Sequence, residues 1–336
     1  MADDVEHLRE RIASAESLYS IVETMRTLAN VNIRRANQAA AAAGEYLRSV
    51  HIALHVALHR GAGARPRPKA QPNARAEAAR TAGAKANPRA DQKANLAAKD
   101  KPGEPPGAAL PILLVLSSNQ GLCGSFNERV AKRAASVAAE AARGCGASLD
   151  AVPVVCVGYR GAGRLMAMGA RVEAVLDAPS SVEAVGPLVR EVYRVVSDRL
   201  RPGRRFIAVY NRPAGGAAFV ESDVQLLPFD PARWRRLPEG EPPFGTIPTL
   251  GGGPVERVLE ELLRELLFID LYRALVESFA AENAARLYSM QGAAENIEEL
   301  IGELTAAYRQ ARQDAITNEL MDIVGGMFAM EGMLTY

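Results

Sequence analysis

The stretch VEHLRERIASAESLYSIVETMRTLANVNIRRANQAAAAAGEYLRSVHIALHVAL, residues 5–58, decides the fold together with LEELLRELLFIDLYRALVESFAAENAARLYSMQGAAENIEELIGELTAAYRQA, residues 259–311. In both stretches, apolar or small residues recur in steps of three and four from end to end. No proline occurs before Pro66 and none follows Pro254, so neither helix has an internal break. A repeat near 3.5 that continues over several heptads predicts a left-handed coiled coil.

The two helices are expected to pair with each other. Many of the repeating positions are alanine, which lets two helix axes approach closely. The simplest arrangement is an antiparallel pair formed by the two ends of one chain, with everything between them inserted as a separate domain. A coiled coil between two copies of the chain is the alternative.

The composition limits the function classes. The 336 residues include 40 Lys and Arg against 39 Asp and Glu, which argues against a nucleic-acid binder that works through bulk charge. No apolar run reaches the roughly 20 residues that cross a bilayer. The acidic start MADDVEHLRE does not read as a signal peptide, and three cysteines make no disulfide framework. We therefore expect a soluble intracellular protein.

Residues 61–108 differ from the rest of the chain. They hold ten basic residues, four acidic residues and seven prolines, with Leu96 as the one large aliphatic side chain. Such a segment buries too little surface to offset its ordering entropy, so it is predicted to be disordered. A solvated linker is the simplest interpretation, and a basic tail that touches an acidic partner is the alternative.

The middle of the chain indicates a small α/β domain. Strands are predicted at 110–116, 152–157, 205–210 and 219–227, and helices at about 127–143 and 181–200. Strands that alternate with helices through short links favour parallel pairing with right-handed crossovers. The predicted fold class is α/β plus coiled coil, that is, long antiparallel N- and C-terminal helices with an inserted Rossmann-like α/β domain. The predicted parts are a coiled-coil helix at 1–60, the basic insert at 61–108, the α/β domain at 109–228, a Pro/Gly-rich linker at 229–253 and a second coiled-coil helix at 254–336.

Three groups of residues are candidates for chemical sites. GYRGAG at 158–163 lies where a nucleotide loop would lie, but its spacing favours a tight strand-to-helix turn. Cys123 lies in a domain without histidine that could activate it. His51, His55 and His59 share one helix face, and an exposed polar face is the preferred interpretation over a zinc site. The sequence thus predicts no catalytic site, no metal and no cofactor in this chain.

Four segments resemble a known family. These are 282–326 (ENAARLYSMQGAAENIEELIGELTAAYRQARQDAITNELMDIVGG), 11–38 (RIASAESLYSIVETMRTLANVNIRRANQ), 117–127 (SSNQGLCGSFN) and the pair YNRPAGG with VQLLPF near 210–229. Taken in their order along the chain, they are similar to the γ subunit of F-type ATP synthases. The resemblance implies a non-catalytic rotor shaft that couples transmembrane H⁺ or Na⁺ flow to ATP synthesis or hydrolysis. It also implies a peripheral position on the cytoplasmic face of a bacterial inner membrane. The implied partners are the α and β subunits, the ε subunit and the membrane c-ring, with one copy of this chain per complex and no nucleic acid.

The resemblance also implies the contact residues. Positions matched to contacts with the β subunits are Arg312, Gln313, Thr317, Met25, Arg26, Arg34 and Arg35. The rotor tip is matched to Ile323, Val324, Met327, Phe328 and Met330, where small and flexible side chains suit rotation inside an apolar sleeve.

The chain departs from the family pattern at several points. Glu23 and Asn32 stand where lysine is usual, and the 61–108 segment is unusual in length and composition. These departures favour the divergent γ subunit of an alternative bacterial F-type ATPase. Two other interpretations stay open from the residues alone: a nucleotide-binding α/β protein with a coiled-coil arm, and a coiled-coil scaffold without a rotary role.

Overall fold

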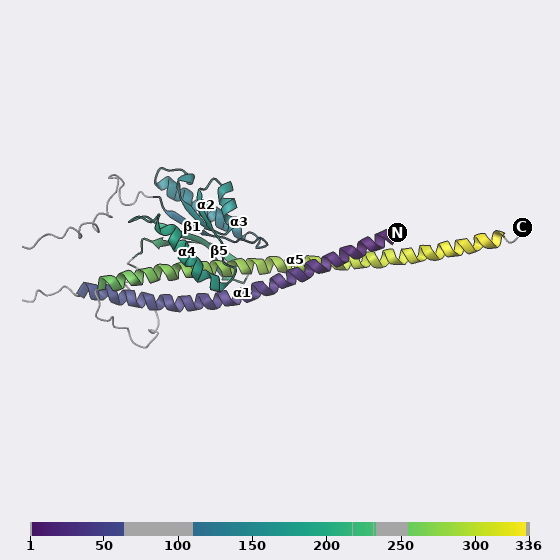
Figure 1. Cartoon of the computed structure of the whole chain (residues 1–336), viewed down its shortest axis with the longest axis horizontal. Coiled ribbons are helices and arrows are strands. Elements are labelled where there is room, and N and C mark those ends of the chain that lie inside the picture. Colours follow the sequence, from purple (N-terminus) through teal and green to yellow (C-terminus); the bar gives the residue numbers. More distant parts are fainter. Residues whose placement is uncertain (1, 64–109, 217, 231, 233–254, 334–336) are drawn as a thin grey trace, which may run out of the picture. The chain divides into compact units, whose positions relative to one another are not determined.

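The computed structural model describes residues 2–63, 110–216, 218–230, 232 and 255–333 (Figure 1). Most of the predicted basic insert and the predicted linker lie outside these residues. The described residues divide into two compact units, one built from 2–46, 110–229 (without 217) and 267–333 and the other from 47–63, 230, 232 and 255–266. The long helices are α1 (Ala2–Gly63) and α5 (Val255–Met333).

The first unit contains a sheet of five strands in the order β3-β2-β1-β4-β5. The strands are β1 (Ile112–Leu116), β2 (Val154–Val157), β3 (Val172–Leu176), β4 (Phe206–Gly215) and β5 (Ala218–Leu227). β1 pairs in parallel with β2 and with β4, β2 pairs in parallel with β3, and β5 runs antiparallel to β4. β1 lies in the centre, which is why all of its ILLVL side chains are buried.

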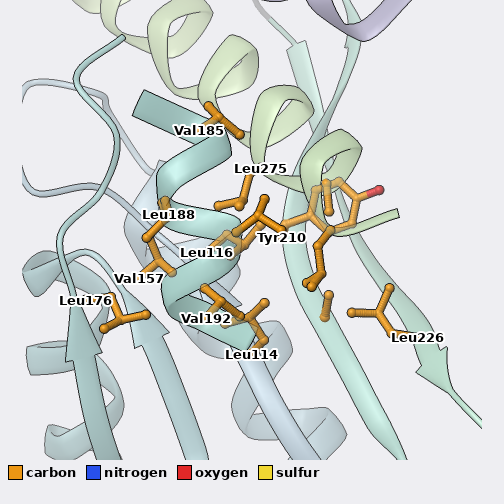
Figure 2. Packing of buried hydrophobic residues seen from close by; sticks show 14 of the residues in the cluster. Leu114, Leu116, Val157, Leu176, Val185, Leu188, Val192, Tyr210, Leu226 and Leu275 are labelled. Carbon is orange, nitrogen blue, oxygen red and sulfur yellow. The ribbon is translucent and has the colours of Figure 1, made fainter. Parts of the chain in front are cut away.

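Helices cover both faces of the sheet. α2 (Phe126–Gly144) and α3 (Tyr159–Ala167) pack on one face, and α4 (Val185–Ser197) packs with α5 on the other (Figure 1). Alternate residues of β1 supply the two cores: Leu113 and Val115 face α2 and α3, whereas Leu114 and Leu116 face α4 and α5. Figure 2 shows the second core, in which Leu275 of α5 lies among side chains of the sheet and α4.

Within the same unit, α1 and α5 run antiparallel. Ala36 of α1 joins the core around Leu275 and Phe279 of α5, and the Asn32 side-chain amide donates to Asn283 Oδ1 at 3.3 Å. Lower numbers in α1 therefore match higher numbers in α5. Ala29 and Ala36 are almost completely buried, because a methyl group is all that fits between two closely spaced helices.

The second unit is built from the end of α1 and the start of α5. Four of its buried apolar side chains come at helical spacing from one face of α1, and Leu266 of α5 is fully buried. These four are Leu47, Val50, Leu54 and Ala57, and Ile52, on another side of α1, is buried as well.

The predicted fold class is confirmed, and three details differ from the sequence prediction. Strand β3 (VEAVL) was not predicted, because four of its five residues are only half-buried and Glu173 interrupts the apolar run. β4 and β5 form an antiparallel hairpin, so the pairing is not parallel throughout. The helix expected at 181–200 is shorter: a 3₁₀ turn, Val182–Ala184, precedes α4.

Candidate partner-binding surfaces

The part of α5 after residue 304 is largely uncovered. Leu304 is the last buried residue of α5, and every described side chain from Thr305 onward is half-buried or exposed. Asn32 of α1 lies beside Asn283 of α5, and the two helices run antiparallel with the same rise per residue. The start of α1, about 30 residues before Asn32, therefore lies level with about residue 313 of α5. Beyond that level α5 has no partner helix from α1.

Arg312, Gln313 and Thr317 lie where this uncovered part begins. All three are exposed. The Thr317 hydroxyl donates to the Gln313 carbonyl at 2.9 Å, a bond to the helix's own backbone. Within the described residues, the Arg312 guanidinium and the Gln313 side-chain amide form no hydrogen bond or ion pair, so both can donate to another molecule.

An apolar stripe continues along the uncovered helix. Its members are between 45% and 63% exposed: Ile316, Leu320, Ile323, Val324 and Met327. Their spacing of three and four keeps them on one face, as in a coiled coil, yet no described residue covers them. Ile323, Val324 and Met327 are predicted tip residues. The side chains of Phe328 and Met330, the other two, lie outside the described residues.

The predicted contact residues of α1 lie on a second surface. Met25 and Arg26 are half-buried, whereas Arg34 and Arg35 are exposed. Arg26 forms an ion pair with Glu23, one turn earlier, so Glu23 serves here as a partner for a neighbouring arginine. Four exposed apolar residues, which the sequence prediction missed, lie on the same stretch: Leu18, Ile21, Leu28 and Val31. Their spacing in steps of three and seven was the signal that could have revealed them.

Arg35 lies near the 3₁₀ turn that precedes α4. A hydrogen bond from Ser181, together with the more distant charge of Arg35, holds the pKa of Glu183 below its ordinary value. The guanidinium of Arg35 is therefore close enough to the α/β domain for its charge to act there. Of the predicted contact residues of α1, Met25 shares a cavity with Glu282 and Arg286 of α5, whereas Arg312, Gln313 and Thr317 lie farther along α5.

A cavity of about 410 Å³ lies where α1, α5 and the loops after β1 and β3 meet. Met25 and Asn32 line it from α1, Asn119 from the loop after β1, and Arg286 from α5. Asn32, the second departure from the family pattern, is thus a lining residue that also bonds to α5.

Next to this cavity, α5 carries a buried ion pair. Arg286 donates to Glu282 Oε1 at 2.6 Å, and both side chains are 10% exposed. Burial raises the pKa of the Glu282 carboxyl, while the charge and hydrogen bond of Arg286 oppose that rise. Both residues fall within the 282–326 segment of the family resemblance, but neither was predicted to have a role.

A second polar group joins α5 to the sheet. The Tyr210 hydroxyl of β4 donates to Glu277 Oε2 at 3.0 Å, and Arg273 Nε donates to Glu277 Oε1 at 2.7 Å. Burial is the largest cause that raises the pKa of the Tyr210 phenol, and the nearby Glu277 charge adds to it. The phenol is therefore a hydrogen-bond donor at every physiological pH.

The tight turn predicted at 158–163 is limited to Gly158, and helix α3 already begins at Tyr159. Gly158 has φ of 95°, and a Cβ on Gly161 would lie 2.4 Å from Ser117 Cβ. Ser117 Oγ fills this space and accepts a hydrogen bond from Gly161 N at 3.2 Å. The position that a phosphate would need beside these amides is occupied by the protein itself, which argues against nucleotide binding in this turn.

Cys123 is a buried side chain of the loop after β1. Its sulfur lies 3.7 Å from Ser118 Oγ and accepts from Asn127 Nδ2 at 3.3 Å. Burial raises the pKa of its thiol, so the nucleophilic thiolate is disfavoured. The interpretation of this loop as a contact loop with no nucleophile agrees with this geometry.

No group of three His, Cys, Asp or Glu side chains among the described residues could hold a metal ion. The side chain of His59 lies outside those residues. No described helix is both long enough and apolar enough to pass through a bilayer.

Comparison with known proteins connects the coiled coil and the inserted domain. A family profile described as ATP synthase matches residues 4–330, nearly the whole chain. This chain belongs to the ATP synthase γ family. The ATP synthase gamma chain of a Nitratiruptor species is 29% identical over 232 residues, which cover 68% of this chain and 75% of the relative. That of Nitrosomonas eutropha is 30% identical over 225 residues, or 65% and 74% of the two chains.

Solved structures agree on the fold of the γ family. A chain in Euglena gracilis mitochondrial ATP synthase (OSCP/F1/c-ring, rotational state 3) matches with a TM-score of 0.55 at 14% identity, covering 100% of this chain and 97% of that one. A chain in the rotor of the same enzyme (rotational state 1) matches with a TM-score of 0.52 at 13% identity, covering 94% and 100%. As a member of the γ family, this chain is a non-catalytic subunit of a two-sector ATPase.

Proposed function

We propose that this chain is the central rotor shaft of an F-type ATP synthase and couples transmembrane ion flow to ATP synthesis or hydrolysis in β subunits by rotation. The observation that carries the proposal is the family match over residues 4–330, which includes the α1 and α5 stretches and the α/β domain between them. In the relatives the corresponding protein is named the ATP synthase gamma chain.

The uncovered end of α5 supports the assignment of the tip. An apolar stripe that no described residue covers loses the stabilisation of burial unless another molecule surrounds it. In the proposed assembly, the hexamer of α and β subunits surrounds this end. Apolar contacts are non-directional, so they allow the helix to turn, whereas strong ion pairs would hold it at one angle.

The polar residues below the tip supply contacts that depend on angle. Arg312 and Gln313 are exposed donors, and we assign them to a carboxylate or carbonyl of a β subunit. Thr317 lies one turn farther along the same face. On α1, Met25, Arg26, Arg34 and Arg35 are assigned to the β segment that moves during turnover. Because one asymmetric shaft contacts three β subunits differently, it can hold three chemically identical sites in three states.

The assembly defines the remaining partners and the location. We assign the α/β domain to the ε subunit and the c-ring, with one copy of the chain per complex. The complex is placed at the cytoplasmic face of a bacterial inner membrane, with this chain peripheral to it. Glu23, Asn32 and the 61–108 segment support a divergent γ subunit of an alternative bacterial F-type ATPase.

Reconstitution tests the proposal. The full chain is mixed with α and β subunits of its own complex, and native mass spectrometry should give one copy of this chain per hexamer. The chain alone should not hydrolyse ATP, and the complex should. A stoichiometric homodimer that excludes α and β would instead support the scaffold interpretation.

A pair of matched variants tests the tip. Ile323→Ser with Met327→Ser removes apolar side chains from the stripe, and Asn318→Ser with Asp322→Ser changes the opposite face of the same turns. The stripe variant should lower ATP-driven ion pumping by at least about threefold, because it loses contacts made during turning, while assembly persists. Equal losses in both variants would contradict the tip assignment.

A further inference from the structure

Glu277 has an unusual position for a carboxylate. It lies within the stretch of α5 from Ala274 to Arg286 in which every residue is buried, and it faces β4. Its two oxygens have separate donors, the Tyr210 hydroxyl and Arg273 Nε. The Glu277 side chain is 11% exposed and that of Arg273 is 44% exposed, so the pair connects the buried interface with solvent.

The sheet and α5 already pack against each other through apolar side chains, without the Glu277 carboxylate. The Tyr210 ring already packs in the apolar core with Leu275, Phe279 and Leu226. Figure 2 shows its hydroxyl oxygen at the rim of that core, directed away from the labelled aliphatic side chains. A second apolar contact lies farther along, where Phe126 and Phe219 of the α/β domain meet Ala281 and Ala285.

Apolar contacts hold two surfaces together without defining their register. Side chains in such a contact can shift with little change in buried area, because the hydrophobic effect is non-directional. A hydrogen bond loses most of its energy when its donor and acceptor move by an ångström or turn out of line. A buried and fully partnered polar group therefore adds directional rigidity that the surrounding leucines and alanines cannot supply.

We propose that Glu277 is a positioning residue that fixes the α/β domain to α5 through Tyr210 and so resists slip between them under torque. This inference rests on the proposed rotor function. Torque that enters through the α/β domain has to reach α5 across their contact, and the Tyr210–Glu277 bond crosses it. Arg273 holds the carboxylate in the orientation that accepts this bond.

A double variant separates positioning from stability. Tyr210→Phe with Glu277→Leu removes both partners and leaves apolar groups of similar shape, a change that is nearly neutral for folding. Arg273 is left free to turn into solvent because it is already partly exposed. We expect unchanged assembly and unchanged ATP hydrolysis in the complex, together with about a twofold fall in the number of ions pumped per ATP. The torsional stiffness of the shaft, measured from angular fluctuations of single stalled complexes, should fall with it.

Two controls keep the result specific. Glu277→Gln keeps one oxygen that can accept from the Tyr210 hydroxyl while the partly exposed Arg273 turns into solvent, so the number of ions pumped per ATP should stay close to that of the wild type. Arg133→Leu with Asp223→Leu removes an ion pair between α2 and β5 inside the α/β domain. This control should leave both the number of ions pumped per ATP and the torsional stiffness of the shaft unchanged. A fall in this control equal to that of the double variant would overturn the proposal, because general softening would then explain both.

The outcomes also separate this inference from the rotor function. A wild-type chain that fails to assemble as one copy per hexamer overturns the rotor function. A wild-type complex that pumps, combined with a double variant that pumps equally well per ATP, overturns the role of Glu277 alone. If the double variant fails to assemble, Tyr210→Phe replaces it, since Arg273 still pairs with Glu277 in that chain; an unchanged ratio there also overturns the role.

Discussion

Two parts of α5 have opposite environments although they belong to one unbroken helix. From Ala274 to Arg286 every residue is buried, with the sheet on one side and α1 on another. From Thr305 to Met327 no described residue is buried. Helix formation is therefore independent of burial here, and the two parts differ in what surrounds them.

Their sequences reflect this difference. The buried part is rich in alanine, and its charges at Glu277, Glu282 and Arg286 all have partners within the protein. The uncovered part carries an apolar stripe together with donors such as Arg312 that stay unpaired among the described residues. A helix enclosed on all sides needs small side chains and paired charges, whereas a helix that awaits a partner keeps its contact groups outward.

The largest difference in stability is expected between a buried and an exposed ion pair of α5. Arg286→Ala leaves Glu282 buried without its partner and should lower the free energy of unfolding by about 4 kcal/mol. The matched change Arg257→Ala breaks an ion pair whose side chains are 78% and 61% exposed, and it should cost less than about 0.5 kcal/mol. Chemical denaturation of both variants measures the difference. Similar losses would mean that the Glu282–Arg286 pair is solvated.

A leucine pair gives the next contrast. Leu271, 1% exposed, packs in the core that faces α4, whereas Leu320 is 57% exposed. Leu271→Ala should lower the free energy of unfolding by about 3 kcal/mol, and Leu320→Ala by less than about 0.5 kcal/mol. The same denaturation curves test this. A large loss in Leu320→Ala would show that the uncovered part is packed in solution.

A smaller effect is expected from pH. Burial raises the pKa of Glu282 in the folded chain, so its contribution to stability is greatest below the pKa of the unfolded state and is lost as pH rises through the folded pKa. Glu282→Gln removes this dependence. As pH rises above the ordinary pKa of a glutamate, the melting temperature of the wild-type chain should therefore fall relative to that of the variant. If the difference between the two melting temperatures stays constant with pH, or if the wild type gains on the variant as pH rises, the raised pKa of Glu282 is contradicted.

The smallest effect on stability is expected at Arg312. Because its side chain is exposed, Arg312→Ala should change the free energy of unfolding by less than about 0.5 kcal/mol. If Arg312 makes the proposed charged contact to a β subunit, coupled ATP turnover of the reconstituted complex should nevertheless fall by about threefold. Asp322→Ala, on the same uncovered part, serves as the control and should retain turnover. A loss of solubility in Arg312→Ala would indicate a packing role instead.

The sequence revealed the long helices and the α/β domain because both depend on repeating patterns. Alanine and leucine at 3.5-residue spacing predict α1 and α5, and a continuous run such as ILLVL predicts a central strand. Strand β3 was not predicted, because an edge strand is buried on fewer sides and needs no continuous apolar run. Glu173 in this strand forms ion pairs with Arg171 and Arg199. Its existence depends on pairing with β2, which no local pattern encodes.

The candidate contacts were only partly accessible from the sequence. Exposed residues such as Arg312 could be named by family resemblance, and the structure confirms their exposure but not their partners. The Tyr210–Glu277 bond joins residues 67 positions apart, so its existence follows from the fold and not from spacing. The same holds for Asn32 and Asn283, which are 251 positions apart.

The outer strand β5 has a consequence for handling the protein. As the last strand of the sheet, it leaves one row of backbone groups without a neighbouring strand in the described sheet. Glu221 and Asp223 lie along it, and Arg129 and Arg133 of α2 hold these carboxylates in place. A second copy that paired with this edge would have to bury these charged side chains, which disfavours edge-to-edge aggregation when the chain is produced without its partners.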